Sequence, residues 1–200
     1  MNKQNKEYRS AILAAEESEE NQLIVSGYAA VVEQPTVICE IDGVQYFEII
    51  DKDAFIGCDM SDVPFKYNHS DNFLVLARTR NKTLALTLDN KGLFIQANLA
   101  PVQAGNDLYG LIQRGDIDKM SFGFTVAQDS YDAQMRTRRI LKIAKVWDVS
   151  AVDTPAYDGT SIDIADGSGI SARDYFKAQA EMEKCLKDQE QRKRLILMTF

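Results

Sequence analysis

The chain has 200 residues, which is enough for one domain with a sizeable core, or for one domain and a tail. An apolar fraction of 45% is ordinary for a globular protein, and the net charge of −7 argues against nonspecific binding to nucleic acid, whose phosphates repel an acidic surface. No apolar run reaches the ~20 residues of a membrane-spanning helix, and the N-terminus lacks the apolar stretch of a secretory signal. The three cysteines (Cys39, Cys58 and Cys185) form no CxxC motif, so we expect free thiols in a reducing compartment.

Most of the first half of the chain has the pattern of β-strands. Short apolar or alternating segments are separated by polar turns, which is typical of strands that pair as hairpins. Asp42-Gly43 favours a tight two-residue turn, and the acidic segment 16–21 and the segment 89–92 are predicted to be solvated turns. The predicted strands span residues 8–15, 23–32, 36–41, 44–50, 63–67, 73–80, 83–88 and 92–99.

Three segments are predicted to be helical. Segment 102–114 has apolar residues at i, i+3 and i+4, and Gly115 is expected to end its helix. Segment 172–197 combines good helix formers with a partial apolar stripe. The short mixed segment 51–60 is expected to form one or two helical turns, capped by Asp51 or Asp53.

The remaining segments complete a mainly β, α+β fold. Residues 120–126 are predicted to form an apolar strand, residues 131–137 a polar connection, and residues 138–152 either two strands or one bent strand. Strands joined by short turns imply an antiparallel sheet, and we expect that sheet to close into a β-barrel flanked by helices. The predicted domain organisation is a β-barrel domain at 1–157, a flexible Gly- and Ser-rich linker at 158–171, and a C-terminal helical segment at 172–200.

Ser121 interrupts an otherwise apolar strand. Because side chains alternate between the faces of a strand, Met120, Phe122 and Phe124 are predicted to face the core, whereas Ser121 and Gly123 face the other way. The small residues on that second face would leave room for a ligand beside an exposed hydroxyl group. A serine in this position is also a common strand residue without any chemical role.

His69 is the single histidine of the chain, and it follows a predicted strand in the polar run 68–72. Any imidazole chemistry near neutral pH must therefore use His69. The alternatives are a surface-loop histidine or a metal ligand, but no second histidine exists, and Cys58 and Asp71 are not at a recognised ligand spacing.

Asp148 is the candidate for a third role. A serine nucleophile needs a base within hydrogen-bonding reach, and the base needs a group that fixes its tautomer. An aspartate within so apolar a strand is costly to bury without a partner, and His69 could be that partner. Asp153, on the opposite face of the same strand, is the second choice, and Asp148 could instead pair with Arg138, Arg139 or Lys145.

Taken together, and in this order, these segments resemble the phage prohead proteases, which mature capsids and are related to the herpesvirus assemblins. The resemblance spans Gly27 to Pro155, and its most specific part is Met120–Phe124. It is also carried by Gly27–Val32, Phe47–Ile50 with Ala54-Phe55, His69, Leu76–Arg78, Lys91–Phe94, Asp107–Arg114 with Gly115-Asp116, Val146–Ser150 and Thr154–Ala156.

The resemblance implies roles for three residues. Ser121 would be the nucleophile and His69 the general base, and Asp148 occupies a position that often holds a glutamate before a Val-Ser pair. The family's fold implies an assemblin-like β-barrel flanked by helices. No cofactor and no metal are implied.

The implied function is that of a serine endopeptidase in prohead assembly, acting inside the procapsid in the host cytoplasm. Its expected partners are the major capsid protein and the scaffolding protein, with self-association as a further expectation and with neither a nucleic acid nor a membrane as partner. Self-cleavage is expected in 158–171. The C-terminal helix would then be a removable targeting segment, or would pack on the domain. The alternative is a noncatalytic assemblin-like module that binds capsid or scaffold protein; a small-ester hydrolase is disfavoured because the chain has no Gly-x-Ser-x-Gly motif.

Overall fold

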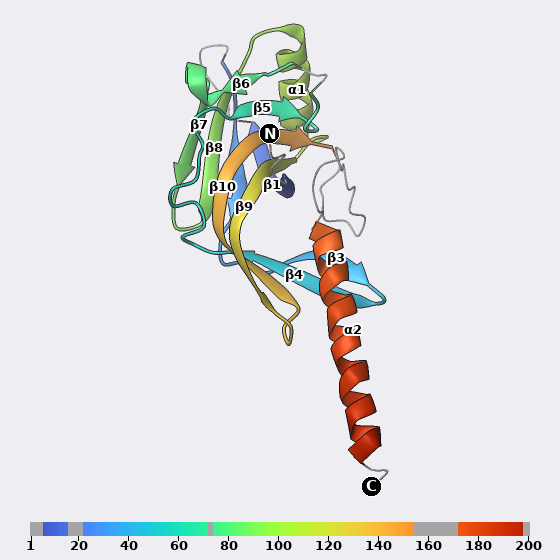
Figure 1. The fold of residues 1–200 in the computed structure, drawn as a ribbon. Coiled ribbons are helices and arrows are strands. Elements are labelled where there is room, and N and C mark those ends of the chain that lie inside the picture. Colours follow the sequence, from blue (N-terminus) through green and yellow to red (C-terminus); the bar gives the residue numbers. More distant parts are fainter. Residues whose placement is uncertain (1–5, 16–21, 72–73, 154–171, 198–200) are drawn as a thin grey trace.

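A computed structural model describes residues 6–15, 22–71, 74–153 and 172–197. These residues form one ten-stranded sheet, two α-helices and a 3₁₀ turn (Figure 1). The elements are β1 (Glu7–Ala15), β2 (Leu23–Val31), β3 (Thr36–Ile41), β4 (Val44–Ile50), β5 (Pro64–Tyr67), β6 (Ala77–Arg78), η1 (Thr79–Asn81), β7 (Leu84–Leu88), β8 (Gly92–Leu99), α1 (Gln103–Arg114), β9 (Lys119–Asp132), β10 (Thr137–Val152) and α2 (Ala172–Leu197). Among the described residues, neither helix is long and apolar enough to cross a membrane.

The sheet is open, so the expected closed β-barrel is wrong. The strand order is β3-β4-β10-β9-β1-β2-β8-β7, and the two end strands, β3 and β7, do not pair with each other. The reason lies at the edge of β10 that does not pair with β9. Two parallel partners divide this edge: Thr137–Ile140 pair with β4, and Val149–Ala151 pair with β5. The β3–β4 hairpin therefore extends the sheet only at the N-terminal end of β10, where it projects away from β7 (Figure 1). The mainly β, α+β class is confirmed.

The hairpins expected from the sequence are largely present. β1 pairs with β2, β3 with β4, and β7 with β8, all antiparallel. Asp42 and Gly43 both have positive φ (51° and 76°), as a tight turn between twisted strands requires. The turn expected at 16–21 lies outside the described residues.

Two local predictions are wrong, and a third holds only in part. Segment 51–60 forms successive turns and no helix, because Asp51, Asp53 and Phe55 each accept one N–H from the residue three positions later. Segment 73–80 contributes only the two-residue strand β6 before the chain turns at η1.

The third concerns residues 131–137, which were expected to form a polar connection. β9 continues to Asp132, and the Asp132 carboxylate accepts the N–H groups of Gln134 and Met135, at 2.9 and 3.0 Å, to close a short hairpin into β10. β10 is one long strand with several bulges, which is the bent-strand alternative for 138–152.

Helix α1 covers one side of the core. Leu108 and Ile112 are its buried apolar residues, and Leu111 of the predicted stripe is partly exposed. Gly115 ends the helix in the left-handed conformation, as predicted, with its N–H bonded to the carbonyls of Leu111 and Ile112. On the sheet, Phe65 of β5 and Phe122 and Phe124 of β9 are fully buried in the same core.

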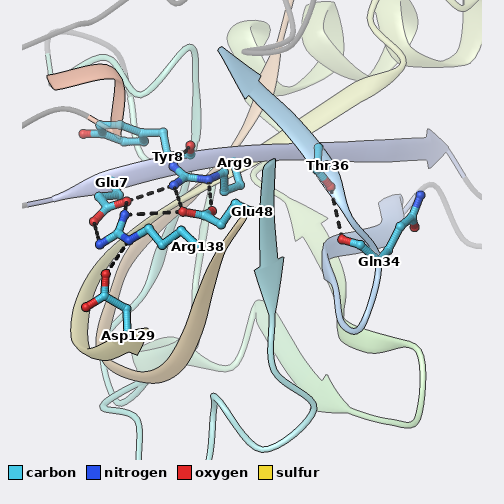
Figure 2. Close-up of polar contacts among 8 residues, drawn as sticks. All are labelled: Glu7, Tyr8, Arg9, Gln34, Thr36, Glu48, Asp129 and Arg138. Carbon is cyan, nitrogen blue, oxygen red and sulfur yellow. Dashed lines mark hydrogen bonds and ion pairs between the residues drawn. The ribbon is translucent and has the colours of Figure 1, made fainter. Parts of the chain in front are cut away.

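A buried network of charges ties β1 to β4, β9 and β10 (Figure 2). Arg9 binds Glu7 and Glu48, and Arg138 binds the same two carboxylates at 2.8–3.3 Å. Asp129 of β9 accepts a further bond from the Arg138 Nε at 2.6 Å. Because the charges are desolvated, each depends on its partners, and the network fixes the position of β1 on the sheet.

Helix α2 rests on the sheet through its first turns. Phe176 is fully buried, and its ring lies 5.3 Å from that of Tyr46 and 6.2 Å from that of Tyr131, measured between centroids. The Tyr131 hydroxyl donates to Glu183 at 3.0 Å, and the Arg138 guanidinium lies 4.3 Å from the centre of the Tyr175 ring. Further along, the helix extends away from the sheet (Figure 1).

The junction of β2 and β8 gives a test of the fold. Gly92 has a φ of 150°, and a Cβ atom there would lie 2.0 Å from the Ala30 carbonyl oxygen. Gly92→Ala is expected to lower the free energy of unfolding by about 2 kcal/mol or more, because the backbone conformation and the contact are both unfavourable. The measurement is urea unfolding followed by circular dichroism.

The matched control is Gly110→Ala in α1, where an added Cβ meets nothing within 4 Å. It should stabilise the protein by about 0.5–1 kcal/mol, because alanine has the higher helix propensity. Equal effects of the two substitutions would contradict the described β2–β8 register.

Candidate active site

His69 is carried by a tight turn at the end of β5. Asn68 and His69 both have positive φ (50° and 52°), and the Ser70 N–H closes the turn on the Tyr67 carbonyl at 3.0 Å. Such a conformation is uncommon outside glycine and must be held by its surroundings. Here the Asn68 N–H donates to the Ala151 carbonyl of β10 at 2.9 Å. The turn therefore fixes the imidazole against β10.

Asp148 is the centre of the site. Its side chain comes from β10 and is fully buried. One oxygen, Oδ1, contacts His69 Nδ1, and the other, Oδ2, contacts the ammonium group of Lys6, which lies just before β1. Two elements distant in the sequence thus supply partners to one buried carboxylate, as a desolvated charge requires.

The environment keeps Asp148 ionised. Burial alone would raise the pKa of its carboxyl group, but the hydrogen bond from His69 and the positive charges of His69 and Lys6 outweigh burial and lower this pKa to about 2. The carboxylate is therefore an acceptor at all ordinary pH values.

Ser150 joins the turn to the carboxylate. Its hydroxyl accepts the His69 backbone N–H at 3.2 Å and donates to Asp148 Oδ1 at 3.4 Å. Ser150 lies two residues beyond Asp148 on β10, so both side chains share one face of the strand. The sequence alternation predicted that shared face, although it gave no role to Ser150.

Ser121 lies on β9 directly opposite Ser150. Directly opposed residues of antiparallel strands face the same way, so Ser121 shares the face that carries Asp148 and His69. His69 Nε2 is buried and has no hydrogen-bond partner in the described part of the chain. With Nδ1 held by a carboxylate, Nε2 is the nitrogen available to take a proton from a hydroxyl group.

The site is more closed than the sequence indicated. Ser121 is 2% exposed, which contradicts the expectation of an exposed hydroxyl group. The space above Gly123 is also filled: a Cβ there would lie 2.7 Å from both Lys6 Cε and Tyr8 Cε1. The Tyr8 ring packs on the His69 ring, with 4.1 Å between centroids. The expected room for a ligand beside Ser121 is occupied by the N-terminal strand.

The other partners weighed for Asp148 are engaged elsewhere. Arg138 belongs to the network with Glu7, and Lys145 pairs with Asp59. Arg139 pairs with Glu33 and Asp51.

Asp153, the second choice for the third role, accepts a hydrogen bond from the Tyr67 hydroxyl at 3.0 Å. Sequence reasoning missed Lys6 and Tyr8, because the pairing of β1 with β9 joins segments more than 100 residues apart.

A family model described as caudovirus prohead serine protease matches residues 10–174. The match covers most of the chain, including Ser121, His69 and Asp148. The chain belongs to this family. The resemblance predicted from the sequence is confirmed, and the relation to herpesvirus assemblins stays a prediction.

The chain is also similar to the prohead protease of Enterobacteria phage HK97. It is 31% identical over 106 residues, which are 52% of this chain and 44% of that protein. The aligned part thus spans less than half of the relative's length. No solved structure matches the chain.

The buried charge of Asp148 gives a test by pH. Asp148→Asn is expected to cost about 3 kcal/mol at neutral pH, because Lys6 and His69 lose their counter-charge. The pKa of Asp148 is lower in the folded than in the unfolded protein, so its contribution is complete above pH ~4 and is lost as pH falls towards 2. The stability difference between the two proteins, measured by urea unfolding, should shrink over that window.

The control is Asp118→Asn. Asp118 pairs with Lys119 at the surface, with side chains 60% and 34% exposed, and its substitution should change stability by less than about 0.5 kcal/mol. A difference for Asp148→Asn that stays constant from pH 7 to 2 would contradict the described pairing.

Proposed function

We propose that this chain is a serine endopeptidase of the phage prohead, with Ser121 as nucleophile, His69 as general base and Asp148 as the group that orients His69. The observation that carries the proposal is the contact of His69 Nδ1 with the buried Asp148 carboxylate, on the face of the sheet that also carries Ser121. Membership of a family of prohead serine proteases supports it.

The proposed reaction follows the chemistry of a serine, histidine and carboxylate triad. Ser121 Oγ attacks the scissile carbonyl carbon while His69 Nε2 takes the hydroxyl proton. When the tetrahedral intermediate collapses, the C–N bond breaks, and His69 delivers that proton to the leaving amine. A water molecule then repeats the sequence on the acyl-enzyme, with His69 again as base, and releases the carboxylic acid and free Ser121. Asp148 remains ionised and stabilises the imidazolium form.

The closed site suits an enzyme whose activity must be delayed. In the described residues His69 Nε2 makes no bond to Ser121, and both side chains are covered. Catalytic hydrogen bonds are often long or absent without substrate and form in the complex. A substrate segment must therefore displace side chains above Ser121, which would limit cleavage before assembly.

The proposed substrates are the scaffolding segment of the capsid protein, a separate scaffolding protein, and the chain itself, all within the procapsid. Self-cleavage is proposed in 158–171, between β10 and α2, a region outside the described residues. α2 is attached to the sheet mainly through the aromatic contacts of Tyr175 and Phe176. Cleavage would leave those contacts and the Tyr131–Glu183 hydrogen bond between the two parts.

A noncatalytic role is the second candidate. The observation in its favour is the same closure, since a module that only binds capsid or scaffold protein has no need of an accessible hydroxyl group. It does not account for the buried charge on Asp148, which is costly unless it serves a purpose.

Removal of the Ser121 hydroxyl tests the proposed nucleophile. Ser121→Ala should lower cleavage of the cognate capsid protein by about 10⁶-fold, since that is the typical cost of losing a triad nucleophile. Intact-mass analysis after incubation, with the capsid protein both free and assembled into proheads, measures the fragments.

The matched control is Ser26→Ala, which removes another poorly exposed strand serine, on β2. It should cleave at the wild-type rate. Fragments produced equally by Ser121→Ala would refute the assignment of Ser121.

The pH dependence of cleavage tests His69 as base. A histidine can act as a general base only in its neutral form, because imidazolium cannot accept a proton. The rate should therefore fall by up to about tenfold per pH unit as the solution is made more acidic, measured from initial rates with circular dichroism to verify folding. A rate that is flat from about pH 5 to 8 in the folded protein would argue against His69.

A further inference from the structure

Lys6 is the residue of the site that neither the sequence motifs nor the proposed triad includes. Its ammonium group contacts Asp148 Oδ2, while His69 occupies Oδ1. The Lys6 side chain is 24% exposed and its nitrogen lies 5.1 Å from the centre of the Tyr8 ring. Gly123 beneath it leaves the space that the lysine stem fills. The lysine is therefore built into the site.

We propose that Lys6 is a positioning residue: it holds Asp148 in the rotamer that meets His69, and it competes with the His69 imidazolium for the carboxylate charge. The effect of Lys6 on catalysis rests on the proposed function, whereas the electrostatic coupling between Lys6 and His69 does not. Lys6 would thus set the pH below which His69 is protonated.

Lys6 is not itself the base. Burial alone would lower the pKa of its ammonium group, but the Asp148 charge and hydrogen bond outweigh burial, so this pKa lies above its ordinary value. A lysine that remains protonated at neutral pH cannot take the proton of Ser121. Its effect on the reaction has to pass through Asp148.

The other charged and titratable groups around Asp148 have their own contacts. Lys66 of β5 is the register partner of Ser150 and forms an ion pair with Asp71. The charge of Asp71 interacts with both Lys6 and Asp148. The Tyr8 ring lies near both Lys6 and His69. All of these groups are the same in Lys6→Met and Lys6→Arg, so the comparison of the two variants isolates the effect of the charge.

The direction of the effect follows from charge. With Lys6 present, protonated His69 is repelled by the nearby ammonium group, and the Asp148 carboxylate that stabilises it is already paired with Lys6. Without Lys6, the whole carboxylate charge is available to the imidazolium. Removing the ammonium group should therefore make His69 easier to protonate, and its titration should move to higher pH.

The single histidine makes this measurable without any substrate. The imidazole resonances of the full chain are titrated by NMR in a Ser121→Ala background, which prevents self-cleavage, and Lys6→Met is compared with Lys6→Arg. Methionine keeps the length and apolar stem, whereas arginine keeps the charge. We expect the titration midpoint to rise by about one pH unit or more in Lys6→Met, a typical effect of one close charge, and by a few tenths at most in Lys6→Arg.

An unchanged or lower midpoint in Lys6→Met, or equal shifts in both variants, would overturn the inference. Lys6→Gln replaces Lys6→Met if circular dichroism shows that the methionine variant is unfolded. The outcome is separate from the proposed function: a shifted titration, together with no cleavage of free or assembled capsid protein by the chain with Ser121 intact, would leave the coupling established and the protease proposal refuted. If both hold, the acid limb of the cleavage rate in a Lys6→Met chain with Ser121 intact should move to higher pH by the same amount.

Discussion

A buried negative charge in the middle of β10 governs the organisation of the candidate site. Because Asp148 is fully buried, the fold must bring positive or hydrogen-bonding groups to both of its oxygens. It does so with His69 from the turn after β5 and with Lys6 just before β1. The left-handed turn at His69, the filled space above Gly123 and the link through Ser150 all follow from this arrangement.

β1 connects this site to the rest of the molecule. The side chains alternate at its start, so that Glu7 and Arg9 enter the buried charge network, while Tyr8, together with Lys6 just before the strand, covers the candidate site. That network includes Arg138, whose guanidinium is covered by Tyr175 of α2. One face of β1 thus covers the candidate site. Residues on its other face bind Arg138, which contacts the C-terminal helix through Tyr175.

The sequence predicted what depends on local pattern and missed what depends on distant pairing. The alternation of apolar and polar residues predicted the hairpins β1–β2 and β3–β4, the strand of Ser121, and the shared face of Asp148 and Ser150. The helical spacing of apolar residues, with Gly115 at the end, predicted α1. The closed barrel was wrong because the edge of β10 is divided between β4 and β5, a non-local choice that no turn residue encodes. Lys6 and Tyr8 were missed because only the β1–β9 register brings them above Gly123. The catalytic roles remain a proposal, for which the sequence order and the geometry give separate support.

The most direct test of the central claim is the reactivity of Ser121 toward a small fluorophosphonate, which needs neither a capsid substrate nor an assembled shell. Intact mass and peptide mapping should find one phosphonyl adduct, on Ser121, formed far more slowly when His69 is replaced by glutamine or Asp148 by asparagine. An adduct elsewhere, no adduct, or a rate on Ser121 that is indifferent to His69 would contradict the claim that the buried Asp148–His69 pair activates this serine.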